Sequence, residues 1–234
     1  GCFLLSLLSA EAGIGTLAAG MAHEISSPLF GIMGLAEAIP DESDATLAAQ
    51  YANDIVVYCK NIGDIVKELS SYSRTASVDG LADVNIRATV DDAIKLIERT
   101  ANPQGVSYQN ECEDGLVVQA KPTEIQQVFV NLLKNATEAA QDEHGKEQGG
   151  QVHIKGGRSF DHIWAKVEDN GVGIPEDRLS MVFDPFYTTK PPGKGTGLGL
   201  NVVYRIVTKY QGNIHVQSTS GEGTTFELQI PVQG

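Results

Sequence analysis

The sequence has few cysteines, no long apolar run and no excess of basic residues, and each of these absences excludes a class of protein. Its three cysteines are far apart and show neither disulfide nor metal-ligand spacing, which fits a reducing compartment. The apolar run at residues 2–8 is much shorter than the roughly 20 residues of a membrane-spanning helix. It also lacks a preceding basic region, so it is no signal peptide. With 17 Lys and Arg against 30 Asp and Glu, the net charge of −13 argues against general nucleic-acid binding.

The remaining composition, with 41% hydrophobic and 20% charged residues, is that of an ordinary globular protein. Its 234 residues are enough for two modest domains. One stretch, residues 185–221, contains no Asp or Glu but four basic residues, which suggests a local anionic ligand. The chain begins with Gly rather than Met, so we interpret it as a fragment of a longer protein. We expect this fragment in the cytoplasm, with any inner-membrane anchor of the parent protein carried by the missing part.

Apolar residues in the first third of the chain recur at steps of three and four, the spacing of amphipathic helices of coiled-coil type. The pattern predicts one helix over residues 11–39, a turn at 40–44 capped by Ser43 or Asp44, and a second helix to about residue 74. A lone hairpin cannot bury both stripes, so two chains should pair into a four-helix bundle. The stripes are Ile14, Leu17, Met21, Ile25, Pro28, Ile32, Leu35 and Ile39, then Leu47, Tyr51, Ile55, Tyr58, Ile62, Ile65, Leu69 and Tyr72.

His23 lies off the first stripe, at about 200° around the helix from its neighbours in that stripe. It should therefore point outward, where another molecule can reach it. Glu24 is beside it, and Pro28, which lacks an N–H group, should kink the helix. The pattern is not the zinc motif H-E-x-x-H, because Ser27 stands in the place of the second histidine. Taken alone, this pattern is a weak signal of function.

From about residue 83 the sequence changes to short strand patterns that alternate with helical ones. This order predicts a two-layer α+β domain with its helices on one face of a sheet. We divide the chain into an apolar lead-in (1–10), a helical hairpin (11–76), a linker (77–82) and the α+β domain (83–234). The predicted strands are 83–86, 106–110, 116–120, 151–155, 162–168, 213–218 and 224–230, and the predicted helices are 89–100, 122–141 and 198–210.

Three amide side chains, Gln127, Asn131 and Asn135, stand four residues apart and form one row on the predicted helix 122–141. Amide oxygens suit a hard cation such as Mg2+, which is often shared with nucleotide phosphates. The alternative is a solvated polar face. We favour binding, because three amides with no acid or base among them, beside an apolar face, are unusual for a solvated surface.

Two glycine-rich segments are further candidates for a nucleotide site. Asp169, at the end of a predicted strand, can accept a hydrogen bond from an exocyclic amine, while Gly171 and Gly173 let the backbone approach a flat ring. A simple Asn-Gly turn is the alternative reading of this segment. Residues 193–200 (GKGTGLGL) lead into a helix whose first N–H groups can hold phosphate. This second segment fits neither the Rossmann nor the P-loop pattern.

Together these segments resemble the catalytic core of the sensor histidine kinases of two-component signalling. The resemblance covers residues 16–231, and chance would seldom place five boxes in this order. His23, Glu24 and Pro28 resemble the H-box, the row Gln127, Asn131 and Asn135 the N-box, Asp169, Gly171 and Gly173 the G1 box, residues 183–186 (FDPF) the F-box, Gly195, Gly197 and Gly199 the G2 box, and residues 221–224 the trailing glycine motif.

The resemblance implies a dimerisation and phosphoacceptor hairpin followed by an ATP-binding domain of the Bergerat type, with ATP and Mg2+ as cofactors. It implies that His23 accepts the phosphoryl group, that Glu24 is its acid–base partner and that Asn135 is the metal ligand. Asp169 would bind the adenine amine, and Phe183 and Phe186 would brace a lid over the phosphates. The implied nucleotide-binding residues are Asn131, Asn135, Asp169, Gly171, Gly173, Phe186, Lys190, Lys194, Gly195, Thr196, Gly197, Leu198 and Gly199.

By the same resemblance, the phosphoryl group would pass from His23 to an aspartate in the receiver domain of a response regulator. Ser27 stands where relatives carry Thr or Asn implicated in dephosphorylating that partner, and its hydroxyl leaves phosphatase activity open. The remaining histidines match no motif, and we expect them on the surface or in strands: His144, His153, His162 and His215.

Two other functions are compatible with the same fold. The first is an ATP-hydrolysing machine, which is disfavoured because Gln127 stands where such ATPases carry a Glu that activates water. The second is a dimeric scaffold without catalysis. Against the scaffold, no box residue needed to bind the nucleotide is missing from the sequence.

Overall fold

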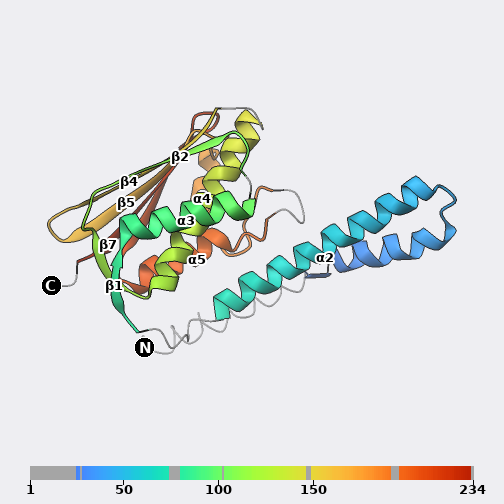
Figure 1. Cartoon of the computed structure of the whole chain (residues 1–234), viewed down its shortest axis with the longest axis horizontal. Helices are drawn as coiled ribbons and strands as arrows, with labels where there is room; N and C mark the ends of the chain where they lie inside the picture. The colour runs from blue at the N-terminus through green and yellow to red at the C-terminus, as the bar shows by residue number, and fades with distance from the viewer. Residues whose placement is uncertain are drawn as a thin grey trace. The chain divides into compact units, whose positions relative to one another are not determined.

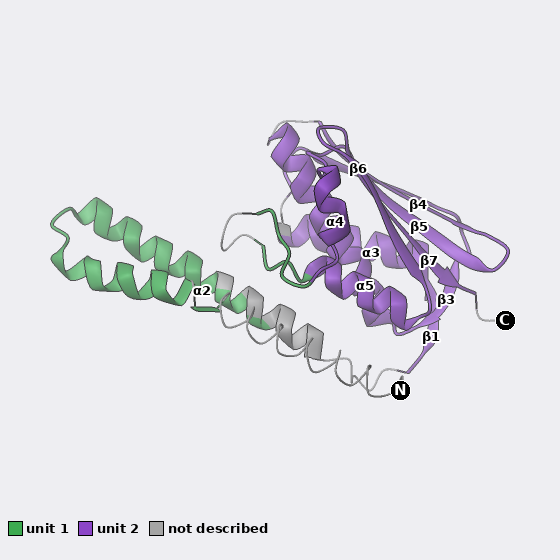
Figure 2. Cartoon of the chain, turned by 180° about the vertical axis from the view of Figure 1, so that it is seen from behind, with its two compact units in different colours: residues 1–77, 185–198 green, residues 78–184, 199–234 purple. Residues whose placement is uncertain are grey.

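The structure is a computed structural model, which describes residues 25–26, 28–73, 80–101, 103–145, 149–190 and 195–232 (Figure 1). Four of the predicted site residues therefore lie outside the described residues: His23, Glu24, Ser27 and Lys194. By its contacts the chain divides into two compact units, residues 1–77 with 185–198 and residues 78–184 with 199–234 (Figure 2). None of the helices in the described part of the chain is both long and apolar enough to cross a membrane.

The first unit contains a helical hairpin, and residues 11–24 of the predicted first helix lie outside the described residues. Residues 28–38 are helical and are followed by the short 3-10 helix η1 (Ile39–Asp41) and the 29-residue helix α2 (Ala45–Ser73). Asp44 caps α2, since its Oδ1 accepts hydrogen bonds from the N–H groups of Thr46 at 2.8 Å and Leu47 at 3.4 Å. The predicted turn and its cap are thus confirmed, and the end of α2 lies within one residue of the predicted end.

Close approach of the two helices depends on a glycine. A Cβ atom on Gly31 would lie 2.8 Å from the Tyr58 ring, so only glycine lets this ring pack directly on the first helix. Large apolar side chains nevertheless remain exposed on both helices of the single chain, which is what an unpaired half of a helical bundle should show. They are Leu29, Phe30 and Met33 on the first helix and Val56, Val57 and Val66 on α2.

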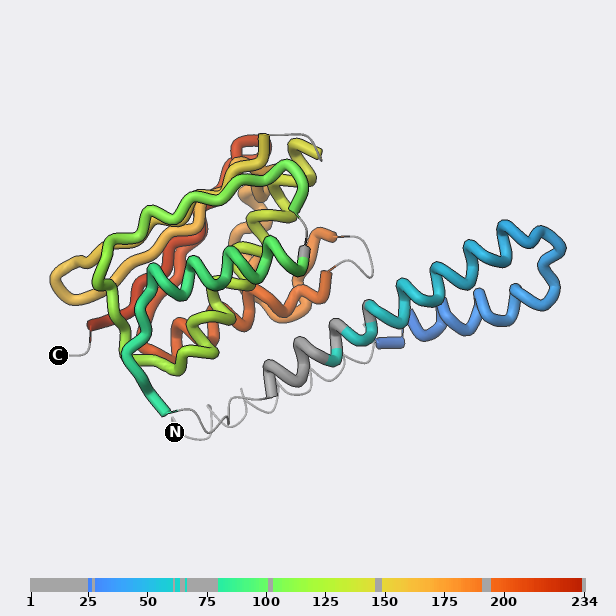
Figure 3. Tube along the Cα trace, in the orientation of Figure 1, coloured from blue at the N-terminus to red at the C-terminus, as the bar shows by residue number. Residues whose placement is uncertain are grey.

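The second unit is a two-layer α/β sandwich. Helices α3, α4 and α5 lie on one face of a five-stranded sheet of order β2-β4-β5-β7-β6 (Figure 1 and Figure 3). Strands β2 and β4 are parallel, the other pairs in this sheet are antiparallel, and β1 and β3 form a separate antiparallel pair. In chain order the elements are β1 (Ala82–Asn85), α3 (Ile86–Ala101), β2 (Val106–Cys112), β3 (Val117–Ala120), α4 (Pro122–His144), β4 (Gly150–Arg158), β5 (His162–Asp169), η2 (Glu176–Met181), α5 (Gly199–Lys209), β6 (Asn213–Thr219) and β7 (Gly223–Pro231).

The core of this unit lies between the helices and the sheet. On β5, alternate residues are buried, so one face of the strand is apolar and the other is not. Phe129 and Leu132 of α4 are fully buried on the facing layer. Each large apolar side chain buried in this way stabilises the fold by about 1.5–3 kcal/mol. The predicted two-layer α+β architecture is confirmed.

Helix α3 begins three residues earlier than the predicted start at residue 89. Asn85, the last residue of β1, also caps this helix, because its Oδ1 accepts a hydrogen bond from the N–H of Ala88 at 3.0 Å. Helix α4 extends to His144, beyond the predicted end at residue 141, and is capped by Gly145, whose φ is 69°.

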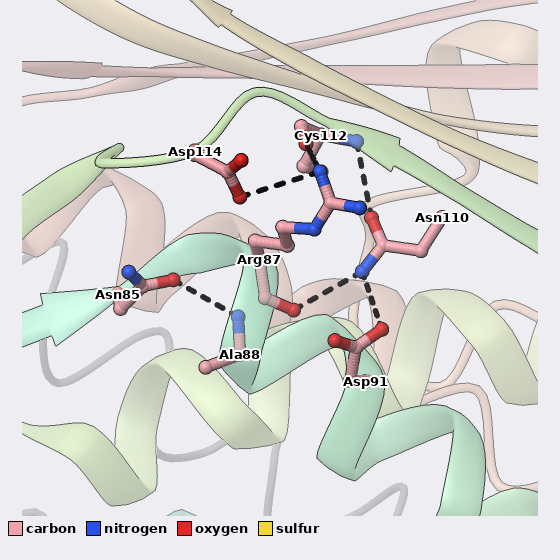
Figure 4. A network of polar contacts seen from close by, with 7 residues as sticks. All are labelled: Asn85, Arg87, Ala88, Asp91, Asn110, Cys112 and Asp114. Atoms are coloured by element: carbon pink, nitrogen blue, oxygen red, sulfur yellow. Dashed lines mark hydrogen bonds and ion pairs between the residues drawn. The ribbon is translucent and has the colours of Figure 1, made fainter.

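A polar network fastens α3 to the edge strand β2 (Figure 4). The Asn110 amide donates to the carbonyl of Arg87 at 3.1 Å and to the Asp91 carboxylate at 2.7 Å, and its Oδ1 accepts from the N–H of Cys112. The Arg87 guanidinium donates to the Cys112 carbonyl at 2.6 Å. Burial raises the pKa of the Cys112 thiol to about 11, so this cysteine stays protonated and unreactive at neutral pH.

Candidate nucleotide-binding site

Helix α4 presents the predicted amide row beside its buried face. Asn131 and Asn135 are half-buried, next to the buried residues Leu132 and Ala136. The Asn131 amide nitrogen donates to the carbonyl oxygen of Gly199, the first residue of α5, at 3.2 Å. Its amide oxygen keeps its capacity to accept. Among the described residues the side chain of Asn135 has no hydrogen-bond partner, so its amide oxygen is available to a cation.

Asp169 is the last residue of β5 and is half-buried. Its Oδ1 accepts hydrogen bonds from the N–H groups of Gly171 at 2.9 Å and Thr224 at 3.2 Å. Within the described part of the chain no hydrogen bond reaches its Oδ2. Burial raises the pKa of this carboxyl to about 6, although the two N–H groups oppose the shift. A partly desolvated carboxylate with an unused oxygen is suited to accept a hydrogen bond from a ligand.

The loop after Asp169 is wedged between α4 and the β6–β7 turn, which explains its glycines. A Cβ on Gly171 would lie 2.3 Å from the carbonyl carbon of Ala139, and one on Gly173, whose φ is 67°, would lie 2.1 Å from the Thr219 carbonyl oxygen. Neither contact leaves room for a side chain. The N–H of Val172 also donates to the Ala139 carbonyl at 3.3 Å. Asp169 is therefore held on a backbone that has no freedom to move towards α4.

The glycines of the second segment close a loop within residues 185–198. The N–H of Phe186 donates to the carbonyl of Gly197 at 3.1 Å, which joins the two ends of the loop. Phe186 has a positive φ of 66°, a conformation that is rare for an aromatic residue. Gly197 has a φ of 64°, and a Cβ there would lie 2.3 Å from the carbonyl carbon of Phe186. Thr196 and Leu198 flank Gly197 in the sequence, and the Leu198 N–H donates to the Thr196 hydroxyl at 3.3 Å.

On the N-terminal side of this loop, Phe183 is anchored on the body of the second unit. Its ring lies 5.8 Å from the Tyr204 ring of α5 and 6.2 Å, edge to face, from the Phe226 ring of β7. The Asn201 amide donates to the Phe183 carbonyl at 2.9 Å. Sequence reasoning did not single out Asn201, and its place in the first turns of a helix that follows a glycine segment was the only available signal.

The described geometry suits an elongated ligand with a flat base at one end and phosphates at the other. Helix α4 contacts Gly199 through Asn131 and the Asp169 loop through Ala139. The two contact points are eight residues apart, which corresponds to about 12 Å along the helix. The N-terminus of α5, an 11-residue helix, supplies backbone N–H groups and a positive dipole end for phosphate.

Comparison with known proteins agrees with this geometry. The family model described as "Histidine kinase-, DNA gyrase B-, and HSP90-like ATPase" matches residues 120–234, and the model described as "His Kinase A (phospho-acceptor) domain" matches residues 14–77. The fold and the site thus define an ATP-binding domain of the histidine kinase-like type, preceded by a phosphoacceptor domain. The chain belongs to the sensor histidine kinases and carries the catalytic core of that family.

Two similar proteins and one similar solved structure are histidine kinases. Sporulation kinase E of Bacillus subtilis is 33% identical over 94% of this chain and 29% of its own length. Sensor histidine kinase ZraS of Escherichia coli is 34% identical over 94% of this chain and 46% of its own length, so the chain spans less than half of either relative. The crystal structure of histidine kinase ThkA in complex with response regulator protein TrrA matches 96% of this chain and 64% of that chain, with a TM-score of 0.75 and 26% identity.

The sequence-predicted site residues are thus described to different degrees. Hydrogen bonds join Asn131 to Gly199, Asp169 to Gly171, and Phe186 to Gly197. Lys190 and Gly195 lie in the same loop as Phe186, and a Cβ on Gly195 would lie 3.0 Å from a methylene carbon of Lys190.

A second residue that sequence reasoning missed is Ser218 of β6. Its hydroxyl accepts from the N–H of Ile174 at 2.8 Å and donates to the carbonyl of Gly223 at 2.8 Å. It therefore joins the loop after Asp169 to the β6–β7 turn. The strand pattern placed Ser218 at the end of β6, but nothing in the sequence indicated which loop that end would meet.

Proposed function

We propose that the chain transfers the γ-phosphoryl group of ATP to His23 and then to an aspartate in the receiver domain of a response regulator. The observation that carries this proposal is that two oxygens, Oδ2 of Asp169 and the amide oxygen of Asn135, accept no hydrogen bond from any described residue. The match of residues 14–77 to a phosphoacceptor domain supports His23, which lies within that range, as the phosphoacceptor.

In this proposal each end of the site has its own task. Asp169 accepts a hydrogen bond from the adenine amine, and Gly171 and Gly173 keep side chains away from the base. Asn135 would hold Mg2+ through its amide oxygen, and the ion would supply positive charge that offsets the charge of the phosphates. Phosphate oxygens accept hydrogen bonds from the N–H groups at the start of α5 and from the positively charged side chains of Lys190 and Lys194. The amide oxygen of Asn135 fits this metal, because Mg2+ prefers oxygen ligands.

The transfer step needs an imidazole that attacks phosphorus in line with the leaving oxygen. His23 supplies that nitrogen, and Glu24 orients the ring and takes its proton. Phosphoryl transfer makes few demands beyond position and charge, so the protein accomplishes it by holding donors and acceptors in place. Ser27 offers a hydroxyl four residues after His23 in the sequence, and this hydroxyl can position water for removal of phosphate from the partner.

We assign residues 11–76 to the dimerisation and phosphotransfer hairpin and residues 83–234 to the ATP-binding domain, joined by a linker at 77–82. The exposed apolar side chains of the hairpin support a homodimer. The solved complex of ThkA with a response regulator supports a receiver domain as the partner. We place the chain in the cytoplasm, with any membrane anchor in segments outside it.

The test is transfer of label from [γ-32P]ATP in the presence of Mg2+. The chain should become labelled, and His23→Gln should abolish the label while ATP still binds. His215→Gln is the matched control, because His215 is exposed on β6 and belongs to none of the boxes. A phosphoramidate is labile in acid and survives base. An acid-stable label, or a label that persists in His23→Gln, contradicts the assignment. Release of phosphate without any label would favour an ATPase instead.

A further inference from the structure

His144 is the last residue of α4 and contacts the loop that carries Asp169. Its Nε2 lies 3.0 Å from the carbonyl oxygen of Asn170, and its ring is half-buried. Because a carbonyl oxygen can only accept, Nε2 must carry the proton and donate. The sequence led us to expect His144 on the surface or in a strand. It is instead half-buried and hydrogen-bonded within the second unit.

The bonded carbonyl belongs to the same peptide group that holds Asp169. The peptide between Asn170 and Gly171 carries the Asn170 carbonyl on one side and the Gly171 N–H on the other. The carbonyl accepts from His144, and the N–H donates to Oδ1 of Asp169 at 2.9 Å. Since the peptide is planar, any rotation that weakens one of these hydrogen bonds also weakens the other.

This peptide needs to be held, because a glycine follows it. Gly171 accepts backbone angles of either sign, so the steric barrier to turning the peptide over is low. The other polar groups of Asn170 are bonded to the start of β4. Its N–H and side-chain oxygen bond the backbone of Gln151, and its side-chain nitrogen donates to the carbonyl of Gly149 at 2.8 Å. These contacts fix Asn170 itself, while His144 fixes the orientation of the peptide that follows.

We propose that His144 is a positioning residue that orients the Asp169 carboxylate through the Asn170–Gly171 peptide and so contributes to selection of an amine-bearing base. The inference rests on the proposed function, in which Asp169 accepts a hydrogen bond from the 6-amino group of adenine. It acts on the base alone, since among the described residues His144 makes no hydrogen bond to the amide row or to α5. Its loss should therefore affect nucleotides according to their base and not according to their phosphates.

The experiment compares ATP with inosine triphosphate, which has the same sugar and phosphates but no 6-amino group. Dissociation constants are measured by calorimetry with Mg2+ for the unmodified chain and for His144→Ala, His144→Gln and Asp169→Asn. His215→Ala is the control, because it removes an exposed histidine far along the chain in β6. We expect His144→Ala to weaken ATP binding about three- to tenfold, the effect of one hydrogen bond, and to leave inosine triphosphate binding unchanged. His144→Gln keeps a donor at the position of Nε2 and should restore ATP binding.

The outcomes separate this inference from the function on which it rests. If His144→Ala weakens the binding of both nucleotides equally, the residue has a structural role only and the inference is overturned. If Asp169→Asn removes the preference for ATP but His144→Ala does not reduce it, the adenine contact stands and the role of His144 is refuted. If Asp169→Asn keeps the preference, the proposed adenine contact itself fails, and the inference fails with it. Should His144→Ala not fold, His144→Asn replaces it, since its shorter side chain cannot reach the Asn170 carbonyl.

Discussion

Replacing Asp169 with Asn should make the nucleotide-free protein more stable and ATP binding weaker. Burial raises the pKa of Asp169 from 3.8 to about 6, which means that the native structure disfavours the charged carboxylate. A raised pKa contributes stability at low pH that is lost as the pH rises through the folded value. At pH 8 the carboxylate is charged, and its cost is present in full.

The size of the effect follows from that shift. One pKa unit corresponds to about 1.4 kcal/mol, but solvent reaches part of the carboxylate, so its cost is smaller than the full shift from 3.8 to about 6 would give. We expect Asp169→Asn to raise the free energy of unfolding by about 1–2 kcal/mol at pH 8. The substitution retains an oxygen that can accept from the N–H groups of Gly171 and Thr224, so only the charge is lost.

The assay is urea unfolding followed by tryptophan fluorescence. Trp164 is the only tryptophan and lies on β5, so its signal reports the second unit. The gain in stability should be smaller at pH 5.5, where much of the wild-type carboxyl is already protonated. ATP binding should weaken by about 10- to 100-fold, because an amide nitrogen would face the adenine amine and a charge-assisted hydrogen bond is lost. An Asn variant that is less stable than the wild type at pH 8, or that gains equally at both pH values, would refute this reasoning.

Four further predictions concern the metal, the loop, the assembly and the question whether transfer runs within or between chains. Asn135→Ala should lose Mg2+-dependent ATP binding in calorimetry, and an unchanged dissociation constant would make the amide row a solvent face. Gly197→Ala should reduce labelling by ATP without changing assembly, because a Cβ would collide with Phe186; equal labelling would contradict this. Light scattering should give twice the chain mass of 25.0 kDa, and Ile62→Asp should weaken the dimer. Mixing His23→Gln chains with Asn135→Ala chains tests whether the phosphoryl group is transferred within one chain or between two. Labelling returns only if transfer runs between chains.

The periodicity of apolar residues and the local capping signals were sufficient to predict most of the helices and strands. Stripes at steps of three and four predicted the helical hairpin, and alternation at steps of two predicted the strands. The cap of α2 by Asp44 was also predictable, because a capping carboxylate acts on N–H groups only two and three residues away. The start of α3 was not, since Asn85 ends a strand and caps a helix at once, and only the pairing of β1 with β3 shows the first of these roles.

Contacts between distant segments could be decided only by the tertiary structure. Asn131 and Gly199 are 68 residues apart, Asp169 and Thr224 are 55 apart, and His144 and Asn170 are 26 apart. Periodicity carries no information about such pairs, because they depend on the order of strands in the sheet and on the register of β5 with β7. The sequence by itself thus determined which residues can do the chemistry, by their type and local spacing. The packing of α4 against the sheet and against α5 determined which of them meet, because long-range contact depends on how buried surfaces fit together.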